Sequence, residues 1–130
     1  MRQNQDKAPQ RFQSWYHERN LSVIVALNNE VLMMLEIYKK YEQDLVMDTD
    51  LLLHGMITGD LYVTNGHLAK IHGMVTGHIY VEPGGKIVIY GMSTGGLTNR
   101  GGIIEIYGSV TGGLHEESGD TLIHSGAKIG

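Results

Sequence analysis

The chain has 130 residues, 42% of them hydrophobic, which suits one domain with a packed interior. It contains no cysteine, so disulfide bonds and thiol chemistry are excluded, and its formal net charge of −4 argues against nucleic acid as a partner. No apolar run is long enough to span a membrane, and the first residues lack the apolar stretch of a signal peptide. We therefore expect a cytoplasmic protein.

Residues 1–20 form a basic and aromatic extension. They hold four basic and two acidic side chains, so the extension carries +2 and the remaining residues carry −6. Phe12, Trp15 and Tyr16 lie within it. Two interpretations stay open: these rings pack on the chain's own first coil, or they contact a partner protein or, less readily, a membrane surface.

Residues 21–43 are strongly apolar and are predicted to form a capping segment. One alternative is a single amphipathic helix, because apolar side chains recur at helical spacing. These side chains are Val31, Met34, Leu35, Tyr38, Tyr41 and Leu45. The other alternative is two short strands, Leu21–Leu27 and Val31–Tyr38, around the turn Asn28-Asn29-Glu30. In either form the segment has enough apolar surface to cover one end of the domain that follows.

Residues 44–130 contain a short glycine-bounded phrase that occurs five times, for example Gly73-Met74-Val75-Thr76-Gly77. The five copies begin at Gly55, Gly73, Gly91, Gly108 and Gly126, at intervals of 18, 18, 17 and 18 residues. A fixed period in this range is typical of stacked structural units. The glycines suit the tight corners between short strands. The segment Asp44-Leu45-Val46-Met47 resembles Asp60-Leu61-Tyr62-Val63, so we expect the repeats to begin near Asp44.

Within each repeat, aliphatic and polar side chains alternate. Between Ile57 and Ile89 the aliphatic residues fall on odd numbers, and the even positions carry threonine, tyrosine, histidine and charged residues. This alternation indicates half-buried strands. The predicted fold is all-β: a single-stranded β-helix with about 18 residues per coil and about five coils. We favour the right-handed form, because the hexad spacing of left-handed forms fails at Ser93 and Asn99.

Equivalent residues of successive coils are predicted to form internal ladders. The three ladders are Leu61, Ile79, Leu97 and Leu114; Ala69, Ile87 and Ile104; and Ile71, Ile89 and Ile106. The single shorter repeat is expected to be absorbed near Leu97–Gly102, with a turn at Asn99–Gly102. His124 falls at a position that the alternation assigns to the interior.

Two histidines, His54 and His72, occupy equivalent positions, and Tyr90 and Tyr107 continue their row. Histidines on neighbouring coils are able to bind zinc. Tyrosine is a poor replacement for such a ligand, so we favour a structural aromatic ladder and expect no metal, cofactor or catalytic residue.

The pattern Gly-x-Val-x-Gly-x-Ile-x-Val, followed by Gly-Gly-x-Ile-x-Ile-x-Gly, is clearest in Gly73–Gly91. It resembles the bactofilins, a family of polymer-forming bacterial cytoskeletal proteins, over roughly Asp44 to Gly130, about two thirds of the chain. The resemblance implies a compact right-handed β-helix without an active site, which assembles end to end through its terminal coils. The apolar segment 21–43 departs from the short polar tails usual in that family, and a cap there blocks one of the two ends.

These observations predict a non-catalytic protein that acts by self-assembly or by protein binding. We expect a homodimer through the C-terminal coil, with Leu122, His124 and Ile129 in the interface. Further candidates for partner contacts are the aromatic residues Phe12, Trp15, Tyr16, Tyr62 and Tyr80. The alternative is a small cytosolic binding protein, such as an immunity protein that neutralises a toxin.

Overall fold

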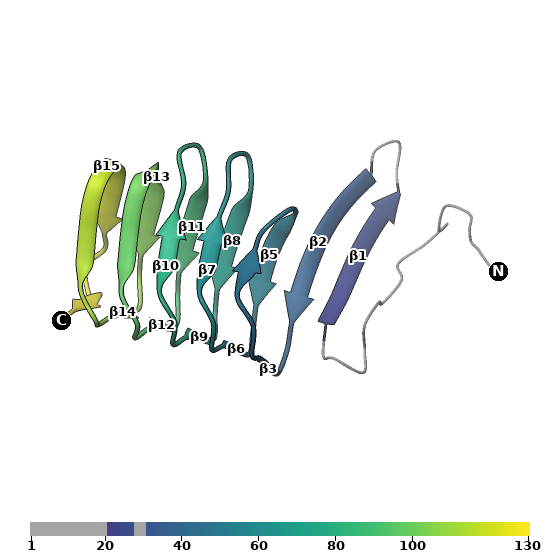
Figure 1. The fold of residues 1–130 in the computed structure, drawn as a ribbon, viewed down its shortest axis with the longest axis horizontal. Coiled ribbons are helices and arrows are strands. Elements are labelled where there is room, and N and C mark those ends of the chain that lie inside the picture. Colours follow the sequence, from purple (N-terminus) through teal and green to yellow (C-terminus); the bar gives the residue numbers. More distant parts are fainter. Residues whose placement is uncertain (1–20, 28–30) are drawn as a thin grey trace.

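The computed structural model describes residues 21–27 and 31–130, and before residue 34 it describes the backbone path alone. The described residues contain strands, turns and bends and no helix. They wind into a parallel β-solenoid of about six turns, seen from the side in Figure 1. The predicted β-helix is confirmed, with one turn more than the repeats indicated.

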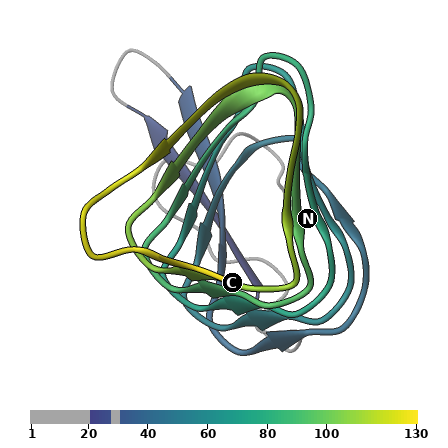
Figure 2. The ribbon, with the colours of Figure 1, turned by 90° about the vertical axis from the view of Figure 1, so that its left-hand side faces the viewer.

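Each turn contributes strands to three faces, which enclose the interior seen end-on in Figure 2. The first face holds β4 (Leu45–Val46), β7 (Leu61–Val63), β10 (Ile79–Val81) and the beginnings of β13 (Leu97–Ile106) and β15 (Leu114–Ile123). The second face holds β2 (Val31–Ile37), β5 (Asp50–Leu53), β8 (Leu68–Ile71), β11 (Lys86–Ile89) and the ends of β13 and β15. The third face holds β3 (Lys40–Tyr41), β6 (Met56–Ile57), β9 (Met74–Val75), β12 (Met92–Ser93), β14 (Ser109–Val110) and β16 (Lys128–Ile129).

The solenoid is right-handed. Seen from its C-terminal end, the chain turns counter-clockwise as it advances towards the viewer (Figure 2). In the side view, β10 runs upward in front and β11 runs downward behind it, while the chain advances to the left (Figure 1). Both views give the hand that the sequence favoured.

The predicted internal ladders pair in register. Leu61, Ile79, Leu97 and Leu114 are partners on adjacent strands of the first face. On the second face, Ala69, Ile87 and Ile104 are partners, as are Ile71, Ile89 and Ile106. All of these side chains are fully buried except Leu114, which lies in the last turn. Their stacking removes apolar surface from water and is the main source of stability.

The corner between the first and second faces is where the repeats differ in length. The spacing from β10 to β13 is 18 residues at Asn99, and the spacing from β11 to β13 is 17 residues at Ile103, so the contraction lies where the sequence placed it. The chain changes direction at Asn99–Gly102 as predicted, but no separate turn interrupts it, because these residues lie within the ten-residue strand β13, whose pairing with β15 is irregular here. The fully buried Asn99 side chain makes this possible: its Oδ1 accepts hydrogen bonds from the amides of Gly101 (3.0 Å) and Gly102 (2.8 Å). The side-chain oxygen of Asn99 thus satisfies two backbone amides at this irregular corner.

The apolar segment before Asp44 forms strands, so the strand alternative holds and the helix alternative is wrong. β1 (Leu21–Leu27) pairs antiparallel with β2. β2 in turn pairs in parallel with β5, with Ile37 opposite Leu53. The parallel pairing therefore starts upstream of Asp44, and the resemblance between Asp44–Met47 and Asp60–Val63 corresponds to the pairing of β4 with β7.

The corner glycines have a steric reason. A Cβ atom on Gly91 would lie 2.1 Å from the carbonyl oxygen of Gly73, and one on Gly108 would lie 2.0 Å from that of Gly91. The backbones of successive turns approach too closely here for any side chain.

Candidate functional site

The C-terminal end of the solenoid exposes residues that are equivalent to the core. One internal ladder of the second face runs through every turn: Ile37, Leu53, Ile71, Ile89, Ile106 and Ile123. The first five are fully buried, whereas Ile123 is 47% exposed. On the third face Val110 is fully buried, and its partner Ile129 in the next turn is 40% exposed. The last turn thus presents an apolar surface that another turn would cover.

The three residues predicted for the assembly interface lie in this last turn but play different parts. Ile129 ends an internal ladder, as just described. Leu122 pairs with Glu105 on the outward side of β15 and is 54% exposed. His124 was predicted to be interior, and this is wrong: its ring stacks on Tyr107 at a corner, with centroids 3.9 Å apart.

The N-terminal end differs from the C-terminal end. The hairpin of β1 and β2 extends the second face with an antiparallel strand (Figure 1). Ile37 lies in β2 and is fully buried, although it belongs to the first turn. An antiparallel strand interrupts the parallel pattern, so a further parallel turn cannot simply continue the second face there.

A column of six aromatic rings, the corner column, follows the corner between the second and third faces. Its members are Tyr38, His54, His72, Tyr90, Tyr107 and His124. Neighbouring rings are nearly parallel, with centroids between 3.9 and 5.8 Å apart and interplanar angles of at most 15°. The predicted aromatic ladder is therefore present and is longer than the sequence indicated, by one residue at each end.

Charged groups accompany the last rings of the corner column. Burial alone would raise the pKa of Glu105, but the Lys86 ammonium group, 3.4 Å away, together with hydrogen bonds from His124 and Tyr107, holds this pKa below its usual value. The Nε2 atom of His124 lies 3.5 Å from the same carboxylate, an ion pair when the imidazole is protonated. Burial, and then the charge of Glu105, raise the pKa of Tyr107. The end of the column therefore favours an ionised carboxylate beside a neutral phenol.

The two tyrosines predicted as partner contacts lie together on the outer side of the first face. The rings of Tyr62 and Tyr80 stack with centroids 5.0 Å apart. The guanidinium group of Arg100 lies over the Tyr80 ring at 4.4 Å and also pairs with Glu82 at 3.1 Å. Burial, and then the nearby charge of Asp60, raise the pKa of Tyr62. This tyrosine pair and its arginine make a small aromatic and charged patch on the first face.

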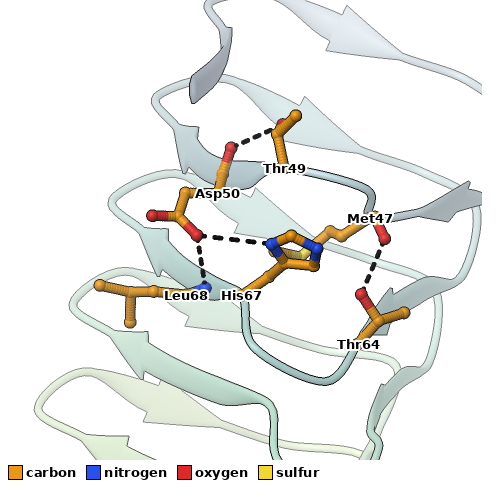
Figure 3. A network of polar contacts seen from close by, with 6 residues as sticks. All are labelled: Met47, Thr49, Asp50, Thr64, His67 and Leu68. Carbon is orange, nitrogen blue, oxygen red and sulfur yellow. Dashed lines mark hydrogen bonds and ion pairs between the residues drawn. The ribbon is translucent and has the colours of Figure 1, made fainter. Parts of the chain in front are cut away.

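A polar network joins turns of unequal length at the corner between the first and second faces (Figure 3). The Asp50 carboxylate accepts a hydrogen bond from the amide of Leu68 at 2.9 Å and lies 3.7 Å from Nδ1 of His67. The Thr64 hydroxyl donates to the carbonyl oxygen of Met47 at 2.8 Å. The spacing between turns changes here from 16 residues at Leu45 to 18 at Leu51, so side chains replace missing backbone partners. We interpret this network as structural.

The sequence analysis missed a surface groove beside the corner column. The groove encloses about 640 Å³ and is lined by methionines, histidines, glycines and lysines of the first four turns. Its methionines, Met56, Met74 and Met92, are partners on adjacent strands of the third face. The repeated sequence His-Gly-Met indicates this groove, but we interpreted it only as a set of corner residues. Phe12, Trp15 and Tyr16 lie outside the described residues.

Comparisons with protein-family models, with curated proteins and with solved structures found no match for this chain. Within residues 21–27 and 31–130, no helix is long and apolar enough to cross a membrane.

Proposed function

We propose that this chain is a non-catalytic assembly protein that forms a homodimer through its C-terminal turn. The observation that carries the proposal is the contrast between the two ends of one ladder, where Ile37 is fully buried and Ile123 is 47% exposed. The bactofilin-like repeat pattern is compatible with the parallel β-solenoid and supports an assembly role. We also propose that the protein is cytoplasmic, as expected from its sequence.

The backbone of the last turn supports the same conclusion. Among the described residues, β15 pairs only with β13, and β16 pairs only with β14. Their outer edges therefore carry unpaired backbone donors and acceptors, which proteins normally cover or use for association. β15 is ten residues long, one of the two longest strands in the described chain, so it offers an extended edge.

A two-fold contact uses these edges without leading to a filament. Two copies that meet through their C-terminal turns would place the two β15 strands antiparallel, so each edge pairs with its own copy. Ile123 and Ile129 of each copy would then be covered, as the equivalent residues one turn earlier already are. Because a closed two-fold contact uses the same surface on both partners, assembly stops at two chains.

The direct test is a charge in the interface. We expect wild-type protein to behave as a dimer in light scattering coupled to size exclusion, and Ile129→Glu to shift it to monomer without loss of the β-rich circular dichroism spectrum. Val46→Glu is the matched control, because Val46 is also apolar and is 63% exposed on the first face near the other end. A wild-type monomer, or equal dissociation by both variants, would contradict the proposed interface.

A truncation tests why assembly stops at two chains. Deleting residues 1–30 removes β1 and leaves β2 as an uncovered parallel edge. We expect this variant to associate head to tail as well, giving longer polymers or aggregates in the electron microscope. Filaments formed by the full-length chain would show that the N-terminal hairpin does not block propagation, and would favour a polymer-forming function.

The alternative function is a small binding protein that neutralises a partner, such as an immunity protein. The patch of Tyr62, Tyr80 and Arg100 is the feature that favours it, because tyrosine and arginine are enriched where proteins bind one another. A wild-type monomer that keeps this form at high concentration would support the alternative over the homodimer.

A further inference from the structure

The groove beside the corner column is lined by a row of methionines and, at its N-terminal end, by two lysines. One row of outward-facing positions on the third face runs through six turns: Lys40, Met56, Met74, Met92, Ser109 and Lys128. The first four members of this row line the groove. The alternate positions, such as Ile57 and Val75, point inward and are fully buried. The three methionines therefore face outward, and Met92 is 38% exposed. They do not contribute to the core of the solenoid.

Three aligned methionines are an unusual choice for an outward row. Outward positions of a half-buried strand normally carry polar residues, as the threonines that follow these strands do. Methionine supplies a soft thioether sulfur as well as apolar surface. The glycines between the row and the corner column are required because the backbones of successive turns approach closely there, so their presence gives no evidence for a ligand. The methionines have no such structural explanation.

The opposite wall of the groove supplies nitrogen donors. His54 and His72 line the same groove as Met56 and Met74. Their rings stack with centroids 5.8 Å apart and an interplanar angle of 15°. Stacking covers the faces of the rings and leaves the nitrogen atoms at their edges. Two adjacent turns thus each place one thioether and one imidazole along a single groove.

We propose that the groove binds a soft monovalent metal ion of the copper(I) and silver(I) class, between Met56 and Met74, with an imidazole of His54 or His72 as a further ligand. Thioether sulfur selects such ions, and imidazole is compatible with them. The spacing fits this arrangement. Met56 and Met74 are partners on adjacent strands, which lie about 4.7–4.9 Å apart. Two flexible thioether side chains at this spacing are able to reach one ion from opposite sides.

The surroundings disfavour harder and divalent ions. Within the described part of the chain, no three histidine or carboxylate side chains converge on one point. The chain has no cysteine to supply a thiolate. Lys39 and Lys40 line the N-terminal end of the groove, and their positive charge opposes a divalent ion more than a monovalent one. The site is therefore expected to discriminate against zinc.

Silver(I) is the probe, because it shares the ligand preference of copper(I) and needs no reductant. Full-length protein is mixed with silver nitrate in chloride-free buffer, desalted, and weighed by native mass spectrometry. We expect wild-type chains to retain a single silver ion, and zinc(II) offered in the same way to be lost. We expect silver to raise the melting temperature, because the ion bridges two turns of the folded state.

Leucine substitutions separate coordination from apolar contact. Met74→Leu keeps the apolar surface and removes the thioether of the central methionine, so we expect silver affinity to fall by about tenfold or more. Met92→Leu leaves both proposed sulfur ligands in place and should change affinity by less than about twofold. His72→Tyr keeps a ring in the corner column and should weaken binding if His72 is the nitrogen ligand, with His54→Tyr testing the other imidazole.

Met34→Leu is the matched control, because Met34 lies in β2 and does not line the groove. It should bind silver as wild type does. Unchanged silver binding by a folded Met74→Leu variant would overturn the proposal and leave the groove as an apolar surface. Equal losses in Met74→Leu and Met34→Leu, or no silver on the wild type after desalting, would also overturn it.

Discussion

Ser93 is a polar residue in an otherwise apolar internal ladder and offers a sharp test of the ladders. It belongs to the internal ladder of the third face, between Val75 and Val110. Its side chain is fully buried, and among the described residues its Oγ atom has no hydrogen-bond partner. Because valine occupies the same position in the turns before and after, the backbone geometry suits a β-branched side chain. We expect Ser93→Val to stabilise the protein.

The magnitude follows from two contributions. Burying a hydroxyl group without a partner costs about 1–3 kcal/mol, and filling the space beside it with a methyl group contributes about 0.8 kcal/mol. Local repacking offsets part of this gain, so we expect Ser93→Val to raise the free energy of unfolding by about 1–3 kcal/mol. For a chain of this size, each kcal/mol shifts the melting temperature by about 4 °C.

Urea unfolding of Ser93→Val, Ser93→Ala and Thr94→Val distinguishes the possible causes. Thr94→Val makes a similar polar-to-apolar change at the adjacent outward position, and should alter stability by no more than about 0.5 kcal/mol. Ser93→Ala removes the hydroxyl without adding volume and should give part of the gain. A destabilised Ser93→Val beside a stabilised Ser93→Ala would mean that this turn has no room for valine. Destabilisation by both would refute the absence of a hydroxyl partner.

Other substitutions test the remaining features of the fold. Ile79→Ala removes a fully buried side chain and should cost about 2–5 kcal/mol in urea unfolding, whereas Thr76→Ala should cost much less; equal losses would refute the inward and outward assignment. Gly91→Ala places a Cβ atom 2.1 Å from the carbonyl oxygen of Gly73 and should cost more than about 3 kcal/mol, or prevent folding. The lowered pKa of Glu105 favours the ionised carboxylate in the folded state, so its stabilising effect is present above the usual glutamate pKa and is lost as pH falls. The stability difference between wild type and Glu105→Gln should therefore shrink on acidification from pH 6 to pH 3, and a constant difference would contradict the shift.

The internal ladders could be predicted from sequence because two periodicities agree. Alternation with period two assigns each side chain to the interior or the exterior, and the period of 18 assigns it to a neighbour in the next turn. For Ile71, Ile89 and Ile106 both assignments are those of the structure. The corner column followed from the same logic for its four middle members, since equivalent corner positions lie directly above one another.

One group of features escaped prediction where the period changes. The corner between the first and second faces varies in length, and single polar side chains, Asn99 and Asp50, satisfy the backbone there. Because such a side chain replaces a backbone partner in one turn only, it leaves no periodic pattern in the sequence. His124 was assigned to the interior because the alternation was extended past the end of β15, where the chain turns the corner. The groove escaped notice because the histidines and methionines that line it lie two residues apart around a corner, and the phrase His-Gly-Met was interpreted only as part of that corner.

In a solenoid, the side chains that face the open end of the last turn are of the same apolar kind as those in the interior. Every turn buries the face of the turn before it, so the last turn exposes the kind of residue that each earlier turn covers. A charged side chain in place of Ile106 would lie within a fully buried ladder, whereas a charged side chain in place of Ile123 would lie on a half-exposed surface. The fold therefore tolerates variation in the last turn that it cannot tolerate one turn earlier. Ile123 and Ile129 remain partly exposed in a single chain, and in the homodimer that we propose the second copy would cover both side chains.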